Sequence, residues 1–423
     1  MKLNEIQKII IDVGSSTVKV YTLSDCAELK LLETKSFNFK ESFDPKLGIT
    51  EKNKQALFTY INKIAYEHKN IPLKLYATAL WRKCVADIQR LLVDEFFIKT
   101  GQFLNIISHE LEGHYLEKAL AGSYNLDLPL LLINIGGGST ELVVIESGSV
   151  KERYNLDLGV MTVLKDFPRL NDQIAFYSLE KVIESICSRM PTTNYKTPYA
   201  IYNGGELTYM RLAGYKLKKN NIFEDDNHPN QISLEDFSAR NKDIFNSITL
   251  KQLEYLMPND TLWMHGARAC SAIAQTVTKH FGVTQIIPSD SNMAHGILRQ
   301  EFRKVVLSGS FRKHLDYILS IKKQLNRKNI EVVSPHFDKP KNPGQEFVIF
   351  EGQEELSPLE LERHHLNMIE LCDALVVCSY NGYVGASTLI EIGYAQALGK
   401  RIIFTEKPTE FILQTLPAEV GLL

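Results

Sequence analysis

The sequence predicts an α/β protein of about three lobes, and three observations lead to this class. The chain has 423 residues, of which 44% are hydrophobic and 23% charged, as in ordinary folded proteins. Two similar segments, 9–20 and 131–144, each read as a strand, a glycine-rich turn and a second strand. From Lys304 onwards, short apolar strands alternate with helices, which predicts a parallel three-layer α/β domain.

The composition and the cysteine pattern exclude several classes of protein. The net charge of −2 gives no bulk basic field, so duplex nucleic acid is not an expected partner. The longest apolar run, Leu128–Ile133, is too short to span a bilayer, and no signal peptide is expected because Asp12 directly follows the apolar run Ile9–Ile11. The six cysteines include no C-x-x-C pair. We therefore expect reduced thiols and a cytoplasmic protein without a membrane partner.

The two similar segments are predicted to be β-hairpins. The first reads Ile-Ile-Ile-Asp-Val-Gly-Ser-Ser from Ile9, and the second reads Leu-Leu-Ile-Asn-Ile-Gly-Gly-Gly from Leu131. Asp12 and Asn134 occupy the same place in the pattern, 122 residues apart, which is too far for a solenoid repeat. That spacing indicates two similar lobes facing a cleft.

Hydrophobic periodicity places the remaining elements before Lys304. We expect a polar surface loop at 220–229 and a strand at 284–288. We expect helices at 54–68, 86–97, 179–189, 234–245, 266–281 and 293–302.

The pattern restarts at Lys304, where a strand at 305–307 precedes a turn of Ser308, Gly309 and Ser310. Residues 338–358 are rich in proline, glycine and acidic residues and are expected to form a loop. Further strands are expected at 330–334, 374–379 and 401–404, and helices at 315–328, 359–371 and 389–398. A ligand of such a domain would lie at the carboxyl ends of the strands.

Three glycine-rich turns indicate a phosphate site, because glycines let backbone N–H groups approach an anion closely. Two of them lie in the matching hairpins, and the third follows the apolar run 199–202. The turns are Gly14-Ser15-Ser16, Gly136-Gly137-Gly138-Ser139-Thr140 and Asn203-Gly204-Gly205.

Over about residues 6–300 these motifs resemble the exopolyphosphatase/guanosine pentaphosphate phosphatase (Ppx/GppA) family. The resemblance extends through Ala77-Thr78-Ala79-Leu80-Trp81-Arg82, through 107–113, and through Leu158-Gly159. It implies a two-lobed actin-like (sugar kinase/Hsp70-like) ATPase fold. It also implies Mg²⁺-dependent hydrolysis of terminal phosphoanhydrides of inorganic polyphosphate or guanosine pentaphosphate (pppGpp).

The resemblance implies roles for individual residues. Glu112 would be the general base, and Arg82 would neutralise phosphate charge. Asp12 and Glu141 would hold or orient the metal or the attacking water, with Asn134 as a further metal ligand. The three glycine turns would bind phosphate.

The sequence departs from the family's motifs at three positions. Asn134 stands where the family has Asp, Leu111 replaces a Glu, and Ala294 stands near an expected Arg. These departures leave a second hypothesis open, a sensor-effector whose phosphatase lobes bind a polyphosphate or alarmone without turnover. A third hypothesis is a non-catalytic interaction protein that retains both folds.

The run from His109 to His114 looks like a zinc-protease helix, but its histidines are at i and i+5. A zinc helix needs i and i+4, on one face, so we expect no zinc there. The alternative for both histidines is a polar helix surface.

Residues 304–423 resemble the nucleoside 2-deoxyribosyltransferase-like family, which has flavodoxin-like folds. The resemblance rests on 305–311, 372–377 and 385–400. It implies nucleotide binding by Ser308, Gly309, Ser310, Asp373, Ser387 and Thr388, and cleavage of an N-glycosidic bond with Glu391 as nucleophile.

Two departures and one alternative accompany this second resemblance. Val306 stands where members often have Tyr, and His365 stands where many have Asp. Thr388 and Glu391 also fit a helix capping box, and Asp373 fits a simple cap at the entry to a strand.

The expected domains are 1–124, the first actin-like lobe, 125–303, the second, and 304–423. The last helix of the second lobe, about 293–303, is expected to pack back on the first. Members of both families often form dimers, so a homodimer is one expectation.

Overall fold

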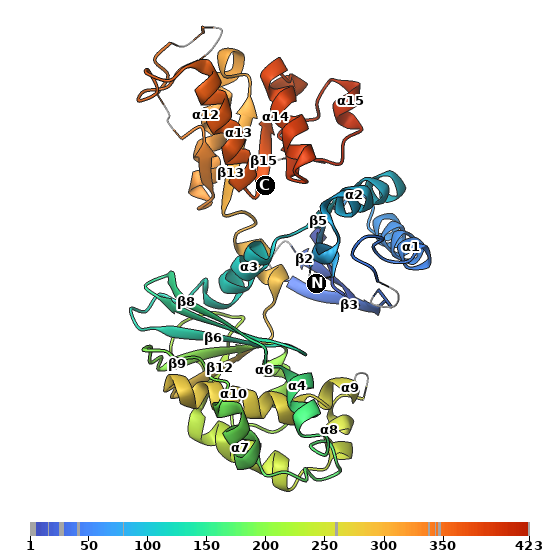
Figure 1. The fold of residues 1–423 in the computed structure, drawn as a ribbon, viewed down its shortest axis with the longest axis vertical. Coiled ribbons are helices and arrows are strands. Elements are labelled where there is room, and N and C mark those ends of the chain that lie inside the picture. Colours follow the sequence, from blue (N-terminus) through green and yellow to red (C-terminus); the bar gives the residue numbers. More distant parts are fainter. Residues whose placement is uncertain are drawn as a thin grey trace, which may run out of the picture. The chain divides into compact units, whose positions relative to one another are not determined.

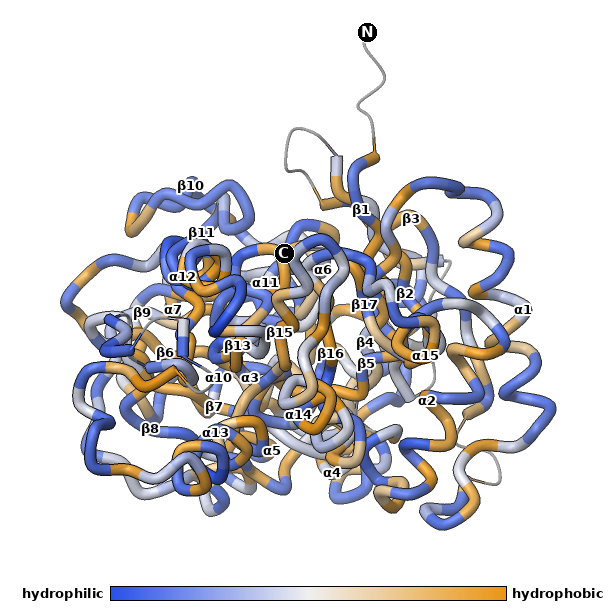
Figure 2. Tube along the Cα trace, turned by 90° about the horizontal axis from the view of Figure 1, so that it is seen from above, coloured by the Kyte–Doolittle hydropathy of each residue, from blue (hydrophilic) through white to orange (hydrophobic). Residues whose placement is uncertain are grey.

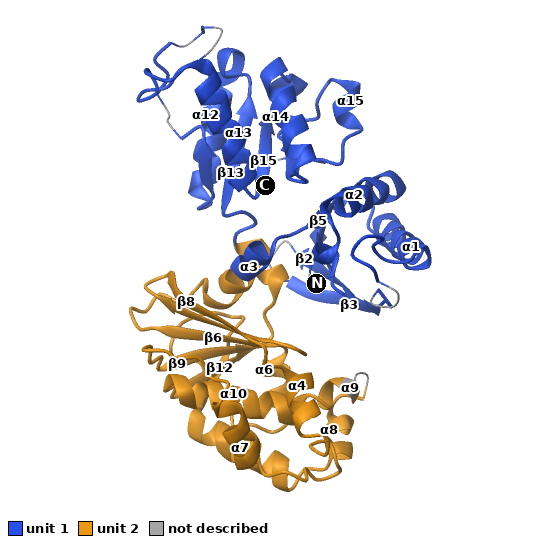
Figure 3. Cartoon of the chain, viewed as in Figure 1, with its two compact units in different colours: residues 1–115, 300–423 blue, residues 116–299 orange. Residues whose placement is uncertain are grey.

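The computed structural model of the chain describes residues 6–15, 17–24, 29–39, 43–78, 80–258, 261–336, 339–342, 344–345 and 348–421. It divides into two compact units (Figure 3). Unit 1 combines residues 1–115 with 300–423, and unit 2 comprises 116–299. Two of the residues quoted above, Ser16 and Ala79, lie outside the described residues, as does one of the six cysteines, Cys26.

The amino-terminal part of unit 1 is a mixed five-stranded sheet of order β3-β2-β1-β4-β5 (Figure 1). β1 pairs antiparallel with β2 and parallel with β4, and we call this part the first lobe. Its strands are β1 (Ile6–Val13), β2 (Thr17–Ser24), β3 (Leu29–Ser36), β4 (Leu73–Ala77) and β5 (Leu104–Ile106). Its helices are α1 (Glu51–Glu67), a 3₁₀ turn (Trp81–Lys83), α2 (Ala86–Thr100) and α3 (His109–Ala121), which continues into unit 2.

Unit 2, the second lobe, contains a seven-stranded sheet of order β10-β11-β12-β9-β6-β7-β8. Its strands are β6 (Leu130–Ile135), β7 (Thr140–Glu146), β8 (Ser149–Leu156), β9 (Tyr199–Asn203), β10 (Lys218–Lys219), β11 (Asn230–Ser233) and β12 (Gln285–Ser289). Its helices are α4 (Val160–Asp166), α5 (Leu179–Cys187), α6 (Glu206–Leu212), α7 (Leu234–Asn246), α8 (Leu250–Leu256), α9 (Thr261–Met264), α10 (Ala267–Phe281) and α11 (Met293–Arg299).

The two lobes share one strand plan. The order β8-β7-β6-β9-β12 repeats β3-β2-β1-β4-β5, with the same parallel and antiparallel pairs. Unit 2 adds β11 and the edge strand β10, which is hydrophilic (blue in Figure 2). The predicted duplication and both predicted hairpins are therefore confirmed.

The carboxyl-terminal part of unit 1 is a five-stranded sheet, parallel throughout, of order β14-β13-β15-β16-β17. Its strands are β13 (Lys304–Gly309), β14 (Glu331–Ser334), β15 (Ala374–Cys378), β16 (Arg401–Phe404) and β17 (Glu419–Val420). Its helices are α12 (Phe311–Arg327), α13 (Pro358–Leu371), a 3₁₀ turn (Tyr380–Gly382), α14 (Ala386–Ala397) and α15 (Phe411–Gln414). We call this part the C-terminal domain. Buried apolar clusters on both faces of its sheet give the predicted three layers.

Local signals explain where several helices begin. The hydroxyls of Thr50, Ser178 and Ser233 accept hydrogen bonds from the third residue of α1, α5 and α7. Ser357 forms a capping box with Glu360 at the start of α13. Thr50 also corrects the expected start of α1 from residue 54 to residue 51, because its cap adds a polar first turn.

Three further expectations need correction. Ser308 and Gly309 are not in a turn but complete β13, where Ser308 pairs with Val377 and Gly309 with Cys378. The helix expected at 389–398 starts at Ala386. The prediction missed the residues before Leu389 because they carry no apolar stripe in the sequence. The helix expected at 293–302 ends at Arg299, which belongs to unit 2 and pairs there with Asp225.

A buried charge cluster joins the two parts of unit 1. Glu301 pairs with Arg401 of β16 at 2.6 Å and lies 3.6 Å from Lys74 of β4. The Tyr76 hydroxyl of β4 donates to the same carboxylate at 2.8 Å. Burial alone would raise the pKa of Glu301, but Arg401, Lys74 and Lys8 outweigh it and hold that pKa well below its usual range. The ionised carboxylate of Glu301 is therefore in contact with β4 of the first lobe and with β16 of the C-terminal domain.

No helix in the described ranges is long and apolar enough to cross a membrane. Five of the six cysteines lie in those ranges, and all five are free thiols.

Candidate functional site

The turn of the first hairpin is closed by a hydrogen bond from Gly14 N to Thr17 O at 2.9 Å. The indole of Trp81 donates to Gly14 O at 3.4 Å from outside the hairpin. Ser15 lies in this turn, and Asp12 lies two residues before it, on β1. The predicted turn and its carboxylate are thus held at the end of a buried strand.

Arg82 and Glu112 are brought together by two short elements of the first lobe. Arg82 lies in the 3₁₀ turn after β4, and Glu112 in the first turn of α3. Arg82 Nη1 pairs with Glu112 Oε2 at 2.6 Å and also donates to Ile107 O at 3.2 Å. Ser108 Oγ accepts from Leu111 N at 3.1 Å and so fixes the start of α3. Both charged side chains stay about one quarter exposed, so a ligand can reach them.

Asp12 has an unusual protonation equilibrium. Burial raises the pKa of its carboxyl to about 6, with Lys19 acting in the opposite direction and Glu112 adding to the rise. Lys19 is its cross-strand partner on β2, and Tyr76 its partner on β4. A second cation at this carboxylate would favour the charged form.

The turn of the second hairpin repeats the first, with Gly136 N donating to Ser139 O at 2.8 Å. Its outer side is backed by α4, where Val160 N donates to Gly136 O at 3.0 Å and Met161 N to Gly137 O at 2.7 Å. The described residues offer no hydrogen-bond acceptor to the N–H groups of Gly137 and Gly138. Free amides in a glycine turn are suited to an anion.

Gly159 is the residue that allows α4 to approach this turn. A Cβ at Gly159 would lie 2.6 Å from Gly138 N and 2.7 Å from Gly136 O. A side chain cannot be accommodated at such distances without moving the backbone. The Leu158-Gly159 pair therefore has a structural reason in this fold.

Polar side chains form a row across three strands of the second lobe. Asn134 of β6 pairs with Glu141 of β7 on one side and with Asn203 of β9 on the other. Asn134 Nδ2 donates to Glu141 Oε2 at 2.9 Å, and Ser139 Oγ donates to Glu141 Oε1 at 2.6 Å. Asn203 Oδ1 is buried and has no hydrogen-bond partner among the described residues. Thr140 is fully buried, and its hydroxyl donates to Leu158 O.

The third turn leads from β9 into α6. Gly204 and Gly205 have φ values of 130° and 94°, which favour glycine. They are followed by Glu206, a buried carboxyl that the motif analysis missed. Burial raises the pKa of Glu206 to about 8, and Asp290 adds to the rise. Only its position after the Asn-Gly-Gly motif could have indicated it.

The donor chemistry of the second-lobe row fits a hard divalent cation. Asn134, Asn203 and Glu141 supply oxygen ligands, and Asn203 Oδ1 is an unsatisfied buried acceptor. Mg²⁺ binds through one or two carboxylates and keeps several waters, so this small set suffices. In the described part of the chain, no group of three or more His, Cys, Asp or Glu residues is placed to hold a metal ion by itself.

The C-terminal domain has its own cavity, of about 300 Å³, at the carboxyl end of β13. Glu391 of α14 lies in it, only 5% exposed, and its Oε2 accepts a short hydrogen bond from Ser308 Oγ. His365 Nε2 lies 3.4 Å from the same oxygen, and His365 Nδ1 is 2.6 Å from Ser334 Oγ. Burial disfavours a charged His365, but Glu391 and then Glu362 outweigh it and raise the pKa of the imidazole. The other predicted residues in the lining are Gly309, Ser310, Ser387 and Thr388.

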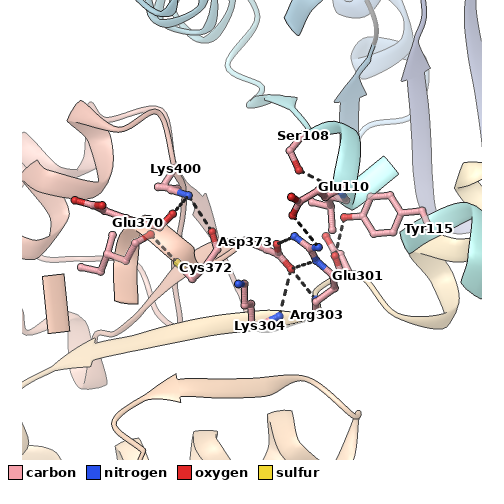
Figure 4. Close-up of polar contacts among 12 residues, drawn as sticks. Ser108, Glu110, Tyr115, Glu301, Arg303, Lys304, Glu370, Cys372, Asp373 and Lys400 are labelled. Atoms are coloured by element: carbon pink, nitrogen blue, oxygen red, sulfur yellow. Dashed lines mark hydrogen bonds and ion pairs between the residues drawn. The ribbon is translucent and has the colours of Figure 1, made fainter. Parts of the chain in front are cut away.

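The capping-box interpretation of Glu391 is wrong. The N-cap of α14 is Gly385, so Thr388 and Glu391 lie inside the helix, where both are buried. Asp373 is not brought to this cavity. It precedes β15 and binds Arg303, with Arg303 Nη2 to Asp373 Oδ1 at 2.7 Å (Figure 4). Asp373 Oδ2 also accepts from the backbone of Arg303 and Lys304, as the strand-entry alternative predicted.

The chain matches the sequence model of the Ppx/GppA phosphatase family over residues 94–305. No curated protein matches the chain. The C-terminal domain after residue 305 lies outside the family match.

Solved structures give the same family and show the fold. The Aquifex aeolicus Ppx/GppA phosphatase, type II variant, has 19% identity and a TM-score of 0.56 over 70% of this chain and 98% of its own. An exopolyphosphatase from Cytophaga hutchinsonii has 16% identity and a TM-score of 0.51 over 69% and 96%. The chain therefore has the α/β fold of these Ppx/GppA structures over the part that they cover.

Proposed function

Because this chain belongs to the Ppx/GppA phosphatase family, we propose that it is a phosphohydrolase that uses Mg²⁺ to release terminal phosphate from inorganic polyphosphate or pppGpp. The observation that carries this proposal is the Arg82–Glu112 pair at 2.6 Å, which joins a cation for phosphate to a carboxylate base. The structure named as an exopolyphosphatase supports the polyphosphate substrate. We also propose a cytoplasmic location, in line with the free thiols.

The residues suit phosphoryl transfer, which depends on positioning and charge stabilisation. Glu112 accepts the proton of the attacking water, which forms a bond to the terminal phosphorus as the bridging P–O bond breaks. Arg82 moves from Glu112 to the phosphoryl oxygens and neutralises their charge. The amides of Gly137 and Gly138 bind the phosphate chain in the same way as other glycine-turn anion sites.

Mg²⁺ would be held by Glu141, Asn134 and Asn203 in the second lobe. In the first lobe, Asp12 is the carboxylate that we propose as a metal ligand. When bound, Mg²⁺ supplies neutralisation of phosphate charge. Asn134 contributes a neutral oxygen where a carboxylate would contribute charge, so we expect weaker metal binding than an aspartate would give.

The test is phosphate release from polyphosphate and from pppGpp, with Mg²⁺ and with EDTA. Glu112→Gln should lower kcat by about 100-fold or more, the usual contribution of a general base. Glu67→Gln, the same change on an exposed part of α1, should leave kcat unchanged. Equal rates for wild type and Glu112→Gln would exclude Glu112 as the base.

The alternative is a sensor whose phosphatase lobes bind ligand without turnover. It is favoured by one contact, because Asn134 Nδ2 donates to Glu141 and occupies one oxygen of that carboxylate. Calorimetry that shows pppGpp or polyphosphate binding, with no phosphate release in the Mg²⁺ assay, would establish this alternative. Rapid turnover of the bound ligand would exclude it.

For the C-terminal domain we propose a flavodoxin-like, nucleoside 2-deoxyribosyltransferase-like activity on nucleosides or nucleotides. The strand order β14-β13-β15-β16-β17 supports the fold, and the Glu391 cavity supports the chemistry. A Glu391 oxygen forms a bond to the anomeric carbon while the C–N bond breaks and the base leaves with the electron pair and takes up a proton. Water then releases the sugar and restores the carboxylate.

Release of free base from a panel of nucleosides and nucleoside monophosphates tests this second activity. Glu391→Ala should abolish it, and Glu355→Ala, a change at an exposed acidic residue, should not. Base release that survives Glu391→Ala would reject the assignment.

A further inference from the structure

Two adjoining cavities lie in unit 1, where residues of the first lobe meet the C-terminal domain. Their volumes are about 390 Å³ and 590 Å³, which is the size range of small-molecule sites. Six residues line both cavities, so we treat the pair as one feature, the junction crevice. The shared residues are Gln89, Asn105, Ile106, Leu398, Gly399 and Lys400.

The larger cavity forms a cationic end of the crevice. Its lining contains five cationic side chains, Arg82, Arg303, Lys304, Lys400 and Arg401, against three acidic ones, Glu110, Glu370 and Asp373. Arg82 pairs with Glu112, Arg303 with Asp373 and Glu110, and Arg401 with Glu301 and Glu419. The two lysine amines of the lining have no ion pair with any described residue.

Lys304 and Lys400 are these two amines (Figure 4). Among the described residues, Lys304 Nζ has neither an ion pair nor a hydrogen-bond partner. Lys400 Nζ donates only to carbonyl oxygens, those of Glu370 at 2.6 Å and Cys372 at 3.1 Å. The Glu370 carboxylate, which accepts from the Tyr394 hydroxyl, offsets part of this charge. An anionic group such as a phosphate would complete the coordination of both amines.

The smaller cavity forms an apolar end. Its lining includes the apolar Val93, Phe103, Leu104, Ile402 and Pro417, together with the charged Asp94 and Arg90, which pairs with Asp87. Between the two ends lie the amides of Gln89 and Asn105. Gln89 Nε2 is engaged with Arg82 O and Cys84 O, whereas the Asn105 side chain has no hydrogen bond to any described residue. An amide beside an apolar wall can bind the polar edge of a flat ring whose faces are covered by apolar groups.

We propose that the junction crevice binds a nucleotide, with its phosphates at Lys304 and Lys400 and its base at the Phe103 end. This site shares no lining residue with the Glu391 cavity. Arg82 lines the cationic end, so a phosphate bound there competes with Glu112 for Arg82. This last coupling rests on the proposed phosphohydrolase function, whereas the binding site does not.

The test is calorimetry on the full chain in EDTA, which separates binding from metal-dependent turnover. The probes are GDP, inorganic pyrophosphate and guanosine. GDP should bind at least about tenfold more tightly than either fragment, because only GDP reaches both ends. Lys304→Gln should weaken GDP about tenfold, the usual effect of one charge-assisted contact. Phe103→Gln should weaken GDP without changing pyrophosphate.

Lys323→Gln, on an exposed part of α12, is the matched control and should leave GDP affinity unchanged. Arg312→Gln removes a charge from the lining of the Glu391 cavity and tests whether GDP binds there instead. The site is overturned by absence of GDP binding, by equal affinity for GDP and pyrophosphate, or by a loss that follows Arg312→Gln and not Lys304→Gln. GDP binding sensitive to Lys304→Gln in a chain that releases no phosphate would uphold the crevice and reject the proposed function.

Discussion

The two lobes contain the same β-hairpin but place different polar side chains beside its turn. Both have the strand order 3-2-1-4-5 within the repeated part, and both close the turn from a glycine N–H to the carbonyl three residues later. In the first lobe the residues around the turn are charged, with Asp12 opposite Lys19. In the second lobe the equivalent pair is Asn134 opposite Glu141. The two lobes therefore share the strand order and the turn geometry, but the charged residues beside the turn differ.

This difference assigns the lobes separate tasks in the proposed reaction. The first lobe holds a buried carboxyl with a raised pKa and the Arg82–Glu112 pair. The second lobe holds backbone amides backed by α4 and a row of neutral or singly charged oxygens. The first lobe therefore supplies two carboxylates and an arginine, and the second supplies backbone amides, neutral amide oxygens and the single carboxylate of Glu141.

The largest expected effect tests the shape of the second turn. Gly159→Ala should lower the free energy of unfolding by about 1–3 kcal/mol, because its Cβ would lie within 2.7 Å of the 136–138 backbone. It should also weaken binding of inorganic triphosphate, since the turn must move. Chemical denaturation and calorimetry measure the two effects.

Two alanine variants provide controls for Gly159→Ala. At Gly138, in the same turn, an added Cβ meets no atom within 4 Å, so Gly138→Ala should change stability little. At Gly14, in the first turn, the nearest contact is Thr17 O at 3.1 Å, which calls for a small adjustment only. Equal destabilisation by all three variants would show that α4 does not constrain the second turn.

The next effect tests the buried charge of the first lobe. Asp12→Asn should stabilise the metal-free protein at pH 8 by about 1–2 kcal/mol, because a carboxyl whose folded pKa is about 6 opposes folding when ionised. As pH falls from 6 towards 4, the wild-type carboxyl takes up its proton in the folded state first. The advantage of Asp12→Asn should therefore shrink over that range.

Urea denaturation in EDTA at several pH values between 4 and 8 measures this linkage. Asp44→Asn, at an exposed residue of the same lobe, is the control and should give no such pH-dependent difference. A stability gain for Asp12→Asn that stays constant from pH 8 to pH 4 would contradict the raised pKa.

The sequence reached the hairpins and most helices because their signals are local. Repetition of Asp12-Val-Gly and Asn134-Ile-Gly placed both turns, and apolar periodicity placed the starts of α5 and α7 at residues 179 and 234. Arg82 and Glu112 were singled out through the family resemblance, but their contact was not predicted, because the two residues are 30 positions apart. Periodicity alone could not have paired them.

Contacts between distant segments were beyond sequence reasoning. Thr388 and Glu391 fit a capping box by spacing, but α14 begins before them, at Ala386, and both side chains are buried within the helix. Asp373 was expected in the nucleotide site of the C-terminal domain, yet its ion pair with Arg303 holds it at the other end of the strands, away from the Glu391 cavity. Asn203 became a candidate ligand because it lies beside Asn134 on the neighbouring strand, and Glu206 was noticed because burial raises its pKa. Neither strand pairing nor burial can be read from a single sequence.

The smallest expected effect comes from giving the second hairpin the carboxylate that the first hairpin has at the equivalent position. Asn134→Asp places a carboxylate beside Glu141, where the amide now donates at 2.9 Å. Two like charges in contact should cost about 1 kcal/mol in EDTA. A divalent cation offsets that repulsion, so Mg²⁺ should raise the Tm of Asn134→Asp more than that of wild type.

Asn62→Asp, on the exposed part of α1, controls for the added charge and should show the wild-type response to Mg²⁺. If Asn134→Asp gains both tighter Mg²⁺ binding and faster phosphate release, the natural amide limits metal binding in this chain. If it gains metal affinity and still releases no phosphate, the sensor alternative is favoured, because the charge deficit would then not be what prevents turnover. An unchanged response to Mg²⁺ would place the metal away from the 134–141–203 row, and the two hairpins would differ in charge without differing in metal binding.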